Sequence, residues 1–176
     1  MKKSKLTRHI VIDVEADGPC PHLYSMVCFA AVCLEADIEP FYGRTAPVSD
    51  RWIPEALAVS GFTRDEHLGF EPPEVTMQAF LDWCGTVSGE RLISWSDNPA
   101  FDWQFVNYYL WRFRGQNPLG FSMRRIGDLY AGYKGSVLNT QGWKKRRQTV
   151  HDHNPLNDAL GNAEALRSLI GEYEGG

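Results

Sequence analysis

Residues 8–16 read RHIVIDVEA, and this stretch decides how the rest of the chain is interpreted. Its run of apolar, β-branched residues predicts a buried strand. Two carboxylates, Asp13 and Glu15, stand in that strand, and both project from one face because side chains alternate. Burying a carboxylate is costly unless a positive charge compensates it. A divalent cation would supply that charge, and a salt bridge or turn cap at the strand end is the alternative.

The composition is that of one globular domain. The chain has 176 residues, of which 43% are hydrophobic and 23% charged, so we predict a single domain over residues 1–176. No apolar run reaches the about 20 residues that cross a bilayer, and we predict no membrane association. Four cysteines without a CxxC pair predict reduced thiols and a cytoplasmic location, with zinc at Cys20 and His22 as a weaker alternative.

Periodicity and turn residues divide the chain into strands followed by alternating helices and strands. The expected elements are strands at 8–16, 23–35 and 38–45, a helix at 73–88, a strand at 91–96, a helix at 98–115, a strand at 124–130, a long polar loop at 132–153, and a helix at 154–173. Short turns between the first three strands predict antiparallel pairing. The whole pattern indicates an α/β sheet with helices on its faces.

The charge is unevenly distributed. The formal net charge is −4, which argues against a nucleic-acid partner, but residues 111–150 contain half of the basic side chains and a single acid, Asp128. Such asymmetry is typical of a surface that binds a polyanion. A solvated helix face followed by a mobile loop would give the same pattern.

Two further segments carry chemistry-bearing residues. Asp102 falls in the first turns of the helix expected at 98–115, where an acid commonly interacts with the helix dipole. His153 and Asp158 are five residues apart, so they cannot share one helix face. We expect Asn154 to cap the last helix and Pro155 to begin it, which leaves His153 before the helix and free to fold back.

Taken together, D-x-E at 13–15, Asp102 within NPAFD and H-x4-D at 153–158 resemble the three motifs of the DEDDh family of 3′–5′ exonucleases. RNase T, oligoribonuclease and the proofreading subunit of bacterial DNA polymerase III are members, and small stand-alone exoribonucleases of the mycobacterial type are the most similar subgroup. The resemblance covers residues 9–170, including IPEALAVSGFTRDE at 53–66. It implies a ribonuclease H-like mixed sheet, three antiparallel strands followed by parallel ones, flanked by helices.

The resemblance also implies an activity. Asp13, Glu15, Asp102 and Asp158 would hold two Mg²⁺ ions, for which Mn²⁺ can substitute, and His153 would take the proton from the attacking water. His151 is the competing histidine. The reaction would remove nucleoside 5′-monophosphates from the 3′ end of single-stranded nucleic acid, with RNA slightly preferred over DNA. A DNA-specific exonuclease and a non-catalytic nucleic-acid-binding accessory subunit are the alternatives.

Substrate contacts and assembly are further implications of the resemblance. The residues expected to bind substrate are Val14, Ala16, Phe62, Asn98, Phe101, Lys144, Lys145, Arg146 and Arg147. Core packing is the alternative for the two phenylalanines. The basic residues are expected to lie on a loop that closes over nucleic acid. A homodimer is also expected, in which the aromatic stretch NYYLWRF at 107–113 would be buried against a partner or within the core. Ser60, Asp97 and Leu129 depart from common family residues and leave the substrate open.

Overall fold

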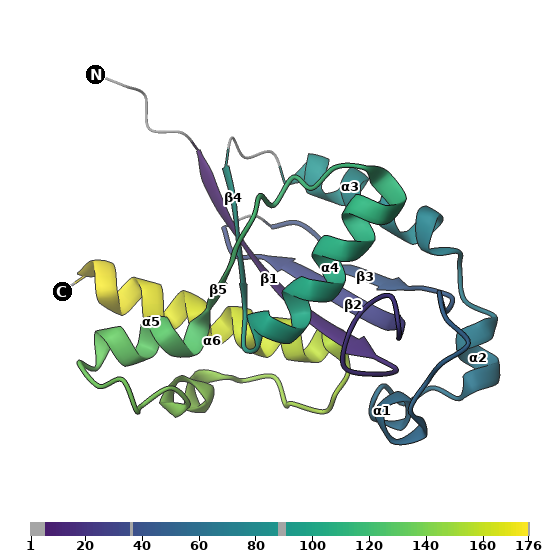
Figure 1. Ribbon diagram of the computed structural model, residues 1–176. Helices are drawn as coiled ribbons and strands as arrows, with labels where there is room; N and C mark the ends of the chain where they lie inside the picture. Colours follow the sequence, from purple (N-terminus) through teal and green to yellow (C-terminus); the bar gives the residue numbers. More distant parts are fainter. Residues whose placement is uncertain (1–5, 36, 88–90, 176) are drawn as a thin grey trace.

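A five-stranded mixed sheet forms the centre of the protein in the computed structural model, which describes residues 6–35, 37–87 and 91–175 (Figure 1). The strands are β1 (Thr7–Ala16), β2 (Met26–Cys33), β3 (Phe41–Arg44), β4 (Arg91–Ser96) and β5 (Met123–Arg125). Their order is β3-β2-β1-β4-β5. The first three strands pair antiparallel, and β4 and β5 continue the sheet in parallel. The predicted fold class is confirmed.

Helices cover both faces of this sheet. They are α1 (Pro54–Val59), α2 (Arg64–Leu68), α3 (Pro73–Thr86), α4 (Pro99–Arg114), α5 (Ile126–Tyr133) and α6 (Pro155–Gly175), with a 3₁₀ helix, η1 (Gly142–Arg146). One hydrophobic cluster joins the sheet to α3 and α4, and a second joins its other face to α5 and α6. Figure 1 shows α4 and α6 on opposite sides of β1.

The strand β1 is buried on both faces. Ile10, Val11 and Ile12 are fully buried, with Ile12 in the α3–α4 cluster and Val11 in the α5–α6 cluster. Because side chains alternate, Asp13 and Glu15 share the face of Val11. The two carboxylates therefore project toward the side of the sheet that α6 covers.

Proline and glycine set the helix ends where the sequence predicts them. Helix α4 begins at Pro99 and ends at Arg114, and its C-cap is Gly115, whose φ of 66° is the left-handed conformation that glycine adopts without strain. Helix α6 begins at Pro155. The side chain of Asn154 accepts the N–H of Leu156 at 3.0 Å, which is the expected cap.

The strand predicted at 124–130 is wrong after Arg125. Helix α5 begins at Ile126, and its buried residues Ile126 and Tyr130 are one helical turn apart. A short apolar run does not distinguish a strand from a helix, and packing against the α5–α6 cluster decides the outcome here. The predicted helix at 73–88 ends at Thr86, and Ser88 lies outside the described residues.

The segment predicted to be a loop at 132–153 is anchored to the core. It contains η1, where Trp143 is fully buried and its indole N–H donates to the carbonyl of Thr140 at 3.0 Å. Trp143 belongs to the same hydrophobic cluster as α6. The sequence prediction failed because one aromatic side chain without periodicity carries no secondary-structure signal.

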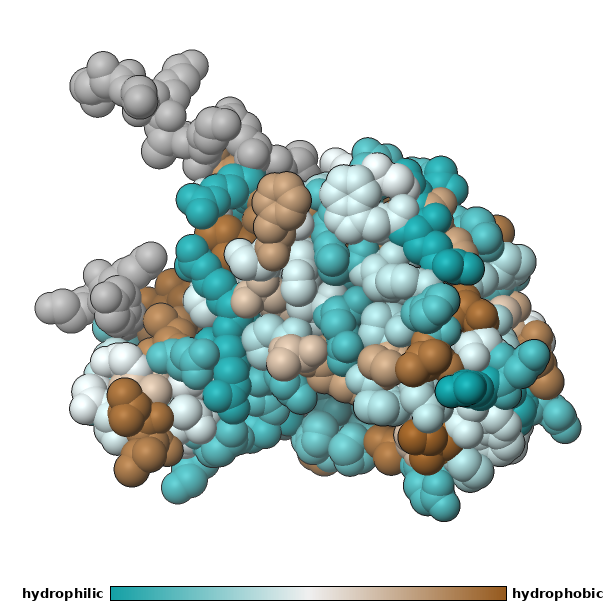
Figure 2. All heavy atoms as spheres, viewed as in Figure 1, coloured by the Kyte–Doolittle hydropathy of each residue, from teal (hydrophilic) through white to brown (hydrophobic). Residues whose placement is uncertain are grey.

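The aromatic stretch at 107–113 belongs mostly to the core. Tyr109 and Leu110 are fully buried, whereas Trp111 is 49% exposed. On the face shown in Figure 2, hydrophobic residues occur in small separated groups among hydrophilic ones. A homodimer stays a prediction. No helix of the described residues has the length and apolarity needed to cross a membrane.

We expect Trp143→Ala to lower the free energy of unfolding by about 3–5 kcal/mol, because it removes a fully buried aromatic side chain. Urea denaturation would measure the loss. Val137→Ala, at a position 86% exposed in the same segment, is the matched control and should change stability by less than about 0.5 kcal/mol. Equal stabilities of the two variants would contradict the anchoring of this segment by Trp143.

Candidate active site

Three segments far apart in the sequence meet at the carboxyl end of β1. One oxygen of Asp13, one of Glu15 and one of Asp158 all lie within 4.8 Å of one another. Asp102, near the start of α4, joins them, because its Oδ1 accepts the N–H of Val14 at 3.1 Å. The structure thus brings together the four acids that the sequence singles out.

Burial and mutual repulsion change the acidity of this cluster. Burial first, and then the charges of Asp102 and Asp158, raise the pKa of Asp13 well above its usual range. Burial, with the charges of Asp158 and Asp102, raises the pKa of Glu15 to about 8. Burial raises the pKa of Asp102 to about 7. Without a compensating cation, these carboxyl groups therefore hold protons near neutral pH.

The acidic cluster fits a divalent cation. Oδ2 of the buried Asp158 carboxylate lacks a hydrogen-bond partner within the described ranges, whereas Oδ1 lies 2.5 Å from Nδ1 of His151. Leaving a buried carboxylate oxygen without a partner is costly. With Asp13 and Glu15 close by, the site offers three hard oxygen ligands of the kind that Mg²⁺ and Mn²⁺ prefer.

One guanidinium group also faces the cluster. Nη2 of Arg147 donates to the carbonyl oxygen of Asp158 at 3.1 Å and lies 3.8 Å from its Oδ1. The Arg147 side chain is only 9% exposed. Its charge lowers the pKa of Asp13, although less than burial raises it. Arg147 therefore offsets part of the negative charge.

Both histidines of the HDH sequence lie at the site. Nδ1 of His153 is 3.7 Å from Oε1 of Glu15, and Nδ1 of His151 is 2.5 Å from Oδ1 of Asp158. Their rings are 4.6 Å apart, and each side chain is about half exposed. His153 has a φ of 61°, an unusual conformation for a residue with a side chain. Geometry alone leaves both histidines within reach of the acids.

The segment before the histidines is fastened to α6. The carboxylate of Glu164 accepts the N–H groups of Gln148 at 2.7 Å and Thr149 at 2.9 Å, and the Thr149 hydroxyl at 2.8 Å. A Cβ at Gly161 would lie 2.9 Å from the Thr149 carbonyl oxygen, so glycine permits this close packing. The same helix carries Asp158 and anchors the chain that leads to the histidines.

The other predicted contact residues are placed as follows. Val14 and Ala16 have buried side chains, 3% and 5% exposed, so any contact to a substrate would come from their backbones. Asn98 stands at the amino end of α4 without a capping hydrogen bond from its side chain. The ring of Phe101 lies 5.2 Å from that of Phe105 and packs against the α3–α4 cluster.

The basic residues at 144–147 have different partners, and the first three of them lie in η1. Arg146 turns toward the end of α6, where its guanidinium pairs with Glu172, and substrate binding by Arg146 would require that pair to break. Lys144 pairs with Asp97, with 2.6 Å between Nζ and Oδ2. Lys145 is exposed. These contacts argue against the predicted closure of the whole run over nucleic acid.

Sequence reasoning missed Asp17, which follows β1 directly. It is fully buried, and its carboxylate accepts the N–H of Ser25 at 2.5 Å and pairs with Arg64 at 3.0 Å. Its carbonyl oxygen accepts the N–H of Ile53 at 2.8 Å. Asp17 thereby holds the segment with α1 and α2 against the end of β1. The only signal in the sequence is a third acid at the same spacing, D-x-E-x-D.

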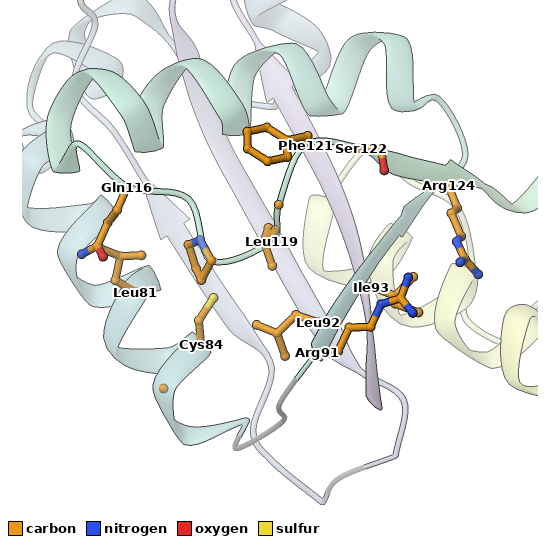
Figure 3. Close-up of a pocket in the computed structure, with 13 residues that line it drawn as sticks. Leu81, Cys84, Arg91, Leu92, Ile93, Gln116, Leu119, Phe121, Ser122 and Arg124 are labelled. Atoms are coloured by element: carbon orange, nitrogen blue, oxygen red, sulfur yellow. The ribbon is translucent and has the colours of Figure 1, made fainter. Parts of the chain in front are cut away.

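A large cavity lies elsewhere. It has a volume of about 650 Å³ and is lined by α3, by β4 near Arg91, and by residues 116–122 (Figure 3). Arg91 pairs with Thr7, at the amino end of β1, whereas the acids lie at its carboxyl end. None of the predicted site residues lines this cavity.

We expect divalent metal affinity to rise with pH. The raised pKa values mean that a cation must displace protons from Glu15 and Asp102, so Mn²⁺ should bind about 10-fold or more tightly at pH 8 than at pH 6. Isothermal titration calorimetry in buffers of different ionisation enthalpy would measure both affinity and proton release. Asp128→Asn, at an exposed acid on α5, is the control and should behave as wild type.

Without metal, the stability of the folded protein should fall as the pH rises from 5 to 8. Because the folded-state pKa of Glu15 lies above its ordinary value of 4.5, its protonated form stabilises the fold at low pH. That stabilisation is lost as pH rises toward 8, and bound metal restores it. A melting temperature without metal that rises steadily from pH 5 to pH 8 would contradict this arrangement.

Comparison with known proteins agrees with this geometry. No protein-family model matches the chain. A curated relative, the 3′–5′ DNA exonuclease Cap18 of Escherichia coli, is 30% identical over 174 residues, which cover 91% of this chain and 90% of that protein.

Solved structures show the same fold at low sequence identity. E. coli exonuclease I in complex with a dA16 oligonucleotide superimposes with a TM-score of 0.70 and 15% identity, over 94% of this chain and 41% of that one. A 3′-exonuclease that recognises the histone mRNA stem-loop gives a TM-score of 0.71 at 14% identity, over 98% of this chain and 84% of that one. The chain thus spans less than half the length of exonuclease I. From the extent of its identity to the curated relative, the chain belongs to the DEDDh family of 3′–5′ exonucleases, within the ribonuclease H-like superfamily.

Proposed function

We propose that the protein is a metal-dependent 3′–5′ exonuclease that removes nucleoside 5′-monophosphates from single-stranded 3′ ends. The observation that carries the proposal is the convergence of Asp13, Glu15 and Asp158 within 4.8 Å, with two histidines beside them. The curated relative is named a 3′–5′ exonuclease, which supports the same reaction.

Four carboxylates would hold the metal. Asp13, Glu15, Asp102 and Asp158 would bind two Mg²⁺ ions, or Mn²⁺ in their place. Such a pair of ions makes water a better nucleophile and stabilises charge on the leaving 3′-oxygen. The chain orients these ligands through its backbone, since the bond from Val14 to Asp102 ties α4 to the end of β1.

His153 is the proposed general base. Its imidazole stands beside Glu15, is half exposed, and is therefore open to water at the mouth of the site. Imidazole accepts and releases protons near neutral pH, which suits this role. His151 lies against Asp158 instead, so we assign it to orienting that carboxylate.

The proposal covers both DNA and RNA. The similarity to small exoribonucleases favours RNA, whereas the curated relative is named a DNA exonuclease. Of the structural neighbours, one is bound to dA16 and another recognises a histone mRNA stem-loop. The curated relative and the second of these neighbours are both named for action at a 3′ end. A non-catalytic accessory subunit is disfavoured, because a pure binder has no use for a buried acidic cluster facing phosphate.

Incubation of 5′-labelled single-stranded DNA and RNA oligomers with Mg²⁺ should give ladders that shorten from the 3′ end. Chelation of the metal should stop the reaction, and Asp158→Asn should lower kcat by about 10³-fold or more. The polymer with the larger kcat/KM is the preferred substrate. Retention of activity by Asp158→Asn, or products cut internally, would refute the proposal.

Substituting each histidine in turn should show which of the two is the general base. We expect His153→Ala to lower kcat by about 10²–10⁴-fold, the usual contribution of a general base. His151→Ala should have a smaller effect on kcat and should weaken Mn²⁺ binding, because it removes a group that contacts Asp158. The reverse order of the two effects on kcat would assign the base to His151.

A further inference from the structure

A pair of arginine and tyrosine side chains extends the acidic face of the sheet toward its edge. In register, Asp13 lies opposite Ala30 and Glu15 opposite Cys28 on β2. Those residues in turn lie opposite Tyr42 and Arg44 on β3. Side chains of directly paired residues project from the same face, so Arg44 stands in the same row as Glu15. Neighbouring strands are about 4.8 Å apart, which puts the backbone of Arg44 about 10 Å from that of Glu15.

Arg44 also lies at the same edge of the sheet as the acids. Because β3 and β1 both run antiparallel to β2, their carboxyl ends coincide, and Arg44 is the last residue of β3. Cys28, which stands between Glu15 and Arg44 in this row, is small and 0% exposed. The Cys28 thiol experiences the charges of Glu15, Asp13 and Arg44, and its pKa is raised mainly by burial. Cys28 lies in one hydrophobic cluster with Leu57, against which Phe62 and Phe70 pack, so side chains of that cluster cover the row between Glu15 and Arg44.

Two aromatic rings hold the guanidinium of Arg44 in place. Its Cζ lies 4.9 Å from the centre of the Phe70 ring and 6.0 Å from that of Phe62. The two rings meet edge to face at 4.9 Å. On the backbone side, the Thr76 hydroxyl donates to the carbonyl oxygen of Arg44 at 2.7 Å. Cation–π contacts orient the guanidinium while leaving its charge and its N–H donors available.

Arg44 differs from three of the four basic residues at 144–147 in having no acid as a partner. Lys144, Arg146 and Arg147 each contact a carboxylate. Among the described residues, no carboxylate comes within 4.0 Å of the Arg44 guanidinium, and Arg44 is exposed.

Arg44 lines a groove along the edge of β3 that also contains two acids, Glu66 and Glu71. The carboxylate of Glu66 is committed to capping α2, where it accepts the N–H and hydroxyl of Thr63, both at 2.8 Å. Glu71 is exposed, so its repulsion toward a phosphate is screened by salt. Arg44 is thus the group in this groove that is suited to bind an anion.

We propose that Arg44 binds a backbone phosphate of the nucleic acid on the 5′ side of the scissile bond, and that Phe62 and Phe70 position its guanidinium. The inference rests on the proposed exonuclease function. The about 10 Å between the backbones of Glu15 and Arg44 is a distance that a few nucleotides of a single strand cover, since its charges are at least about 3.4 Å apart. Phe62 therefore supports a phosphate contact through Arg44. Because its ring already contacts Phe70 and the Arg44 guanidinium, we do not expect it to stack on a base.

Substrate length provides the test. We would compare Arg44→Gln with wild type on the p-nitrophenyl ester of thymidine 5′-monophosphate and on 5′-fluorescein-labelled single-stranded hexanucleotides of DNA and RNA. The ester is too short to reach Arg44, so its kcat and KM should not change. For the hexanucleotide, KM should rise about 10-fold with kcat unchanged, and the slope of log KM against log salt should fall by about 0.7.

Two further variants separate a phosphate contact from a structural effect. Arg91→Gln removes an exposed arginine from the opposite end of the sheet and should behave as wild type on both substrates. Phe70→Leu keeps the charge of Arg44 but removes one supporting ring, so KM for the hexanucleotide should rise while the salt slope stays that of wild type. An unchanged salt slope in Arg44→Gln, or equal changes in KM for ester and hexanucleotide, would overturn the proposal.

Failure of the proposed function would give a different result. A wild-type protein that hydrolyses neither substrate with Mg²⁺ or Mn²⁺ would refute the exonuclease assignment. Fluorescence anisotropy of the labelled hexanucleotide with Ca²⁺ would still measure binding in that case. Weaker binding and a reduced salt slope in Arg44→Gln would support the phosphate contact, and binding equal to wild type would exclude it.

Discussion

The cost of placing several carboxylates in one buried spot is the constraint on which the rest of this structure depends. Asp13, Glu15, Asp102 and Asp158 come from the end of β1 and the starts of α4 and α6. Burial raises the pKa of the first three, and repulsion from the other acids adds to it at Asp13 and Glu15, so as carboxylates they are stable together only with added positive charge. The fold must hold them against that repulsion, and it does so through β1, which is buried on both faces, and through helices that pack on it.

The surrounding contacts can be understood as responses to this constraint. Val14 ties Asp102 to β1 through one backbone hydrogen bond, and Arg147 brings a guanidinium to Asp158 from a segment fastened to α6 by Glu164. Asp17 fixes the other side of the strand end through Arg64. Each contact restrains a segment that bears an acid or a histidine. The acids are therefore held in place by buried contacts, whereas the two histidines are half exposed, where substrate and water would enter.

Much of the fold could be predicted from the sequence because the strong signals are local. The apolar run in 8–16, the prolines at 99 and 155, and Gly115 act within a few residues of where they stand, and those elements were confirmed. The order of acids and histidine was sufficient to suggest the family. The predictions failed where packing decides the structure and the local pattern does not. Ile126–Tyr133 is a helix because it packs into the α5–α6 cluster, and Trp143 anchors a segment that lacks periodicity.

The phosphate-binding role proposed for Arg44 could not be predicted from sequence because it depends on register across two strand pairings. Nothing near Arg44 in the chain resembles a basic motif, whereas the basic run at 144–147, which does, is largely engaged with acids. A net charge of −4 is therefore no obstacle to binding nucleic acid. What counts is whether a cation is exposed, oriented and without an acidic partner on the face that the acids occupy. Pairing removes most of the arginines and lysines near the site from that role, and a guanidinium held by aromatic rings keeps its full charge for a phosphate.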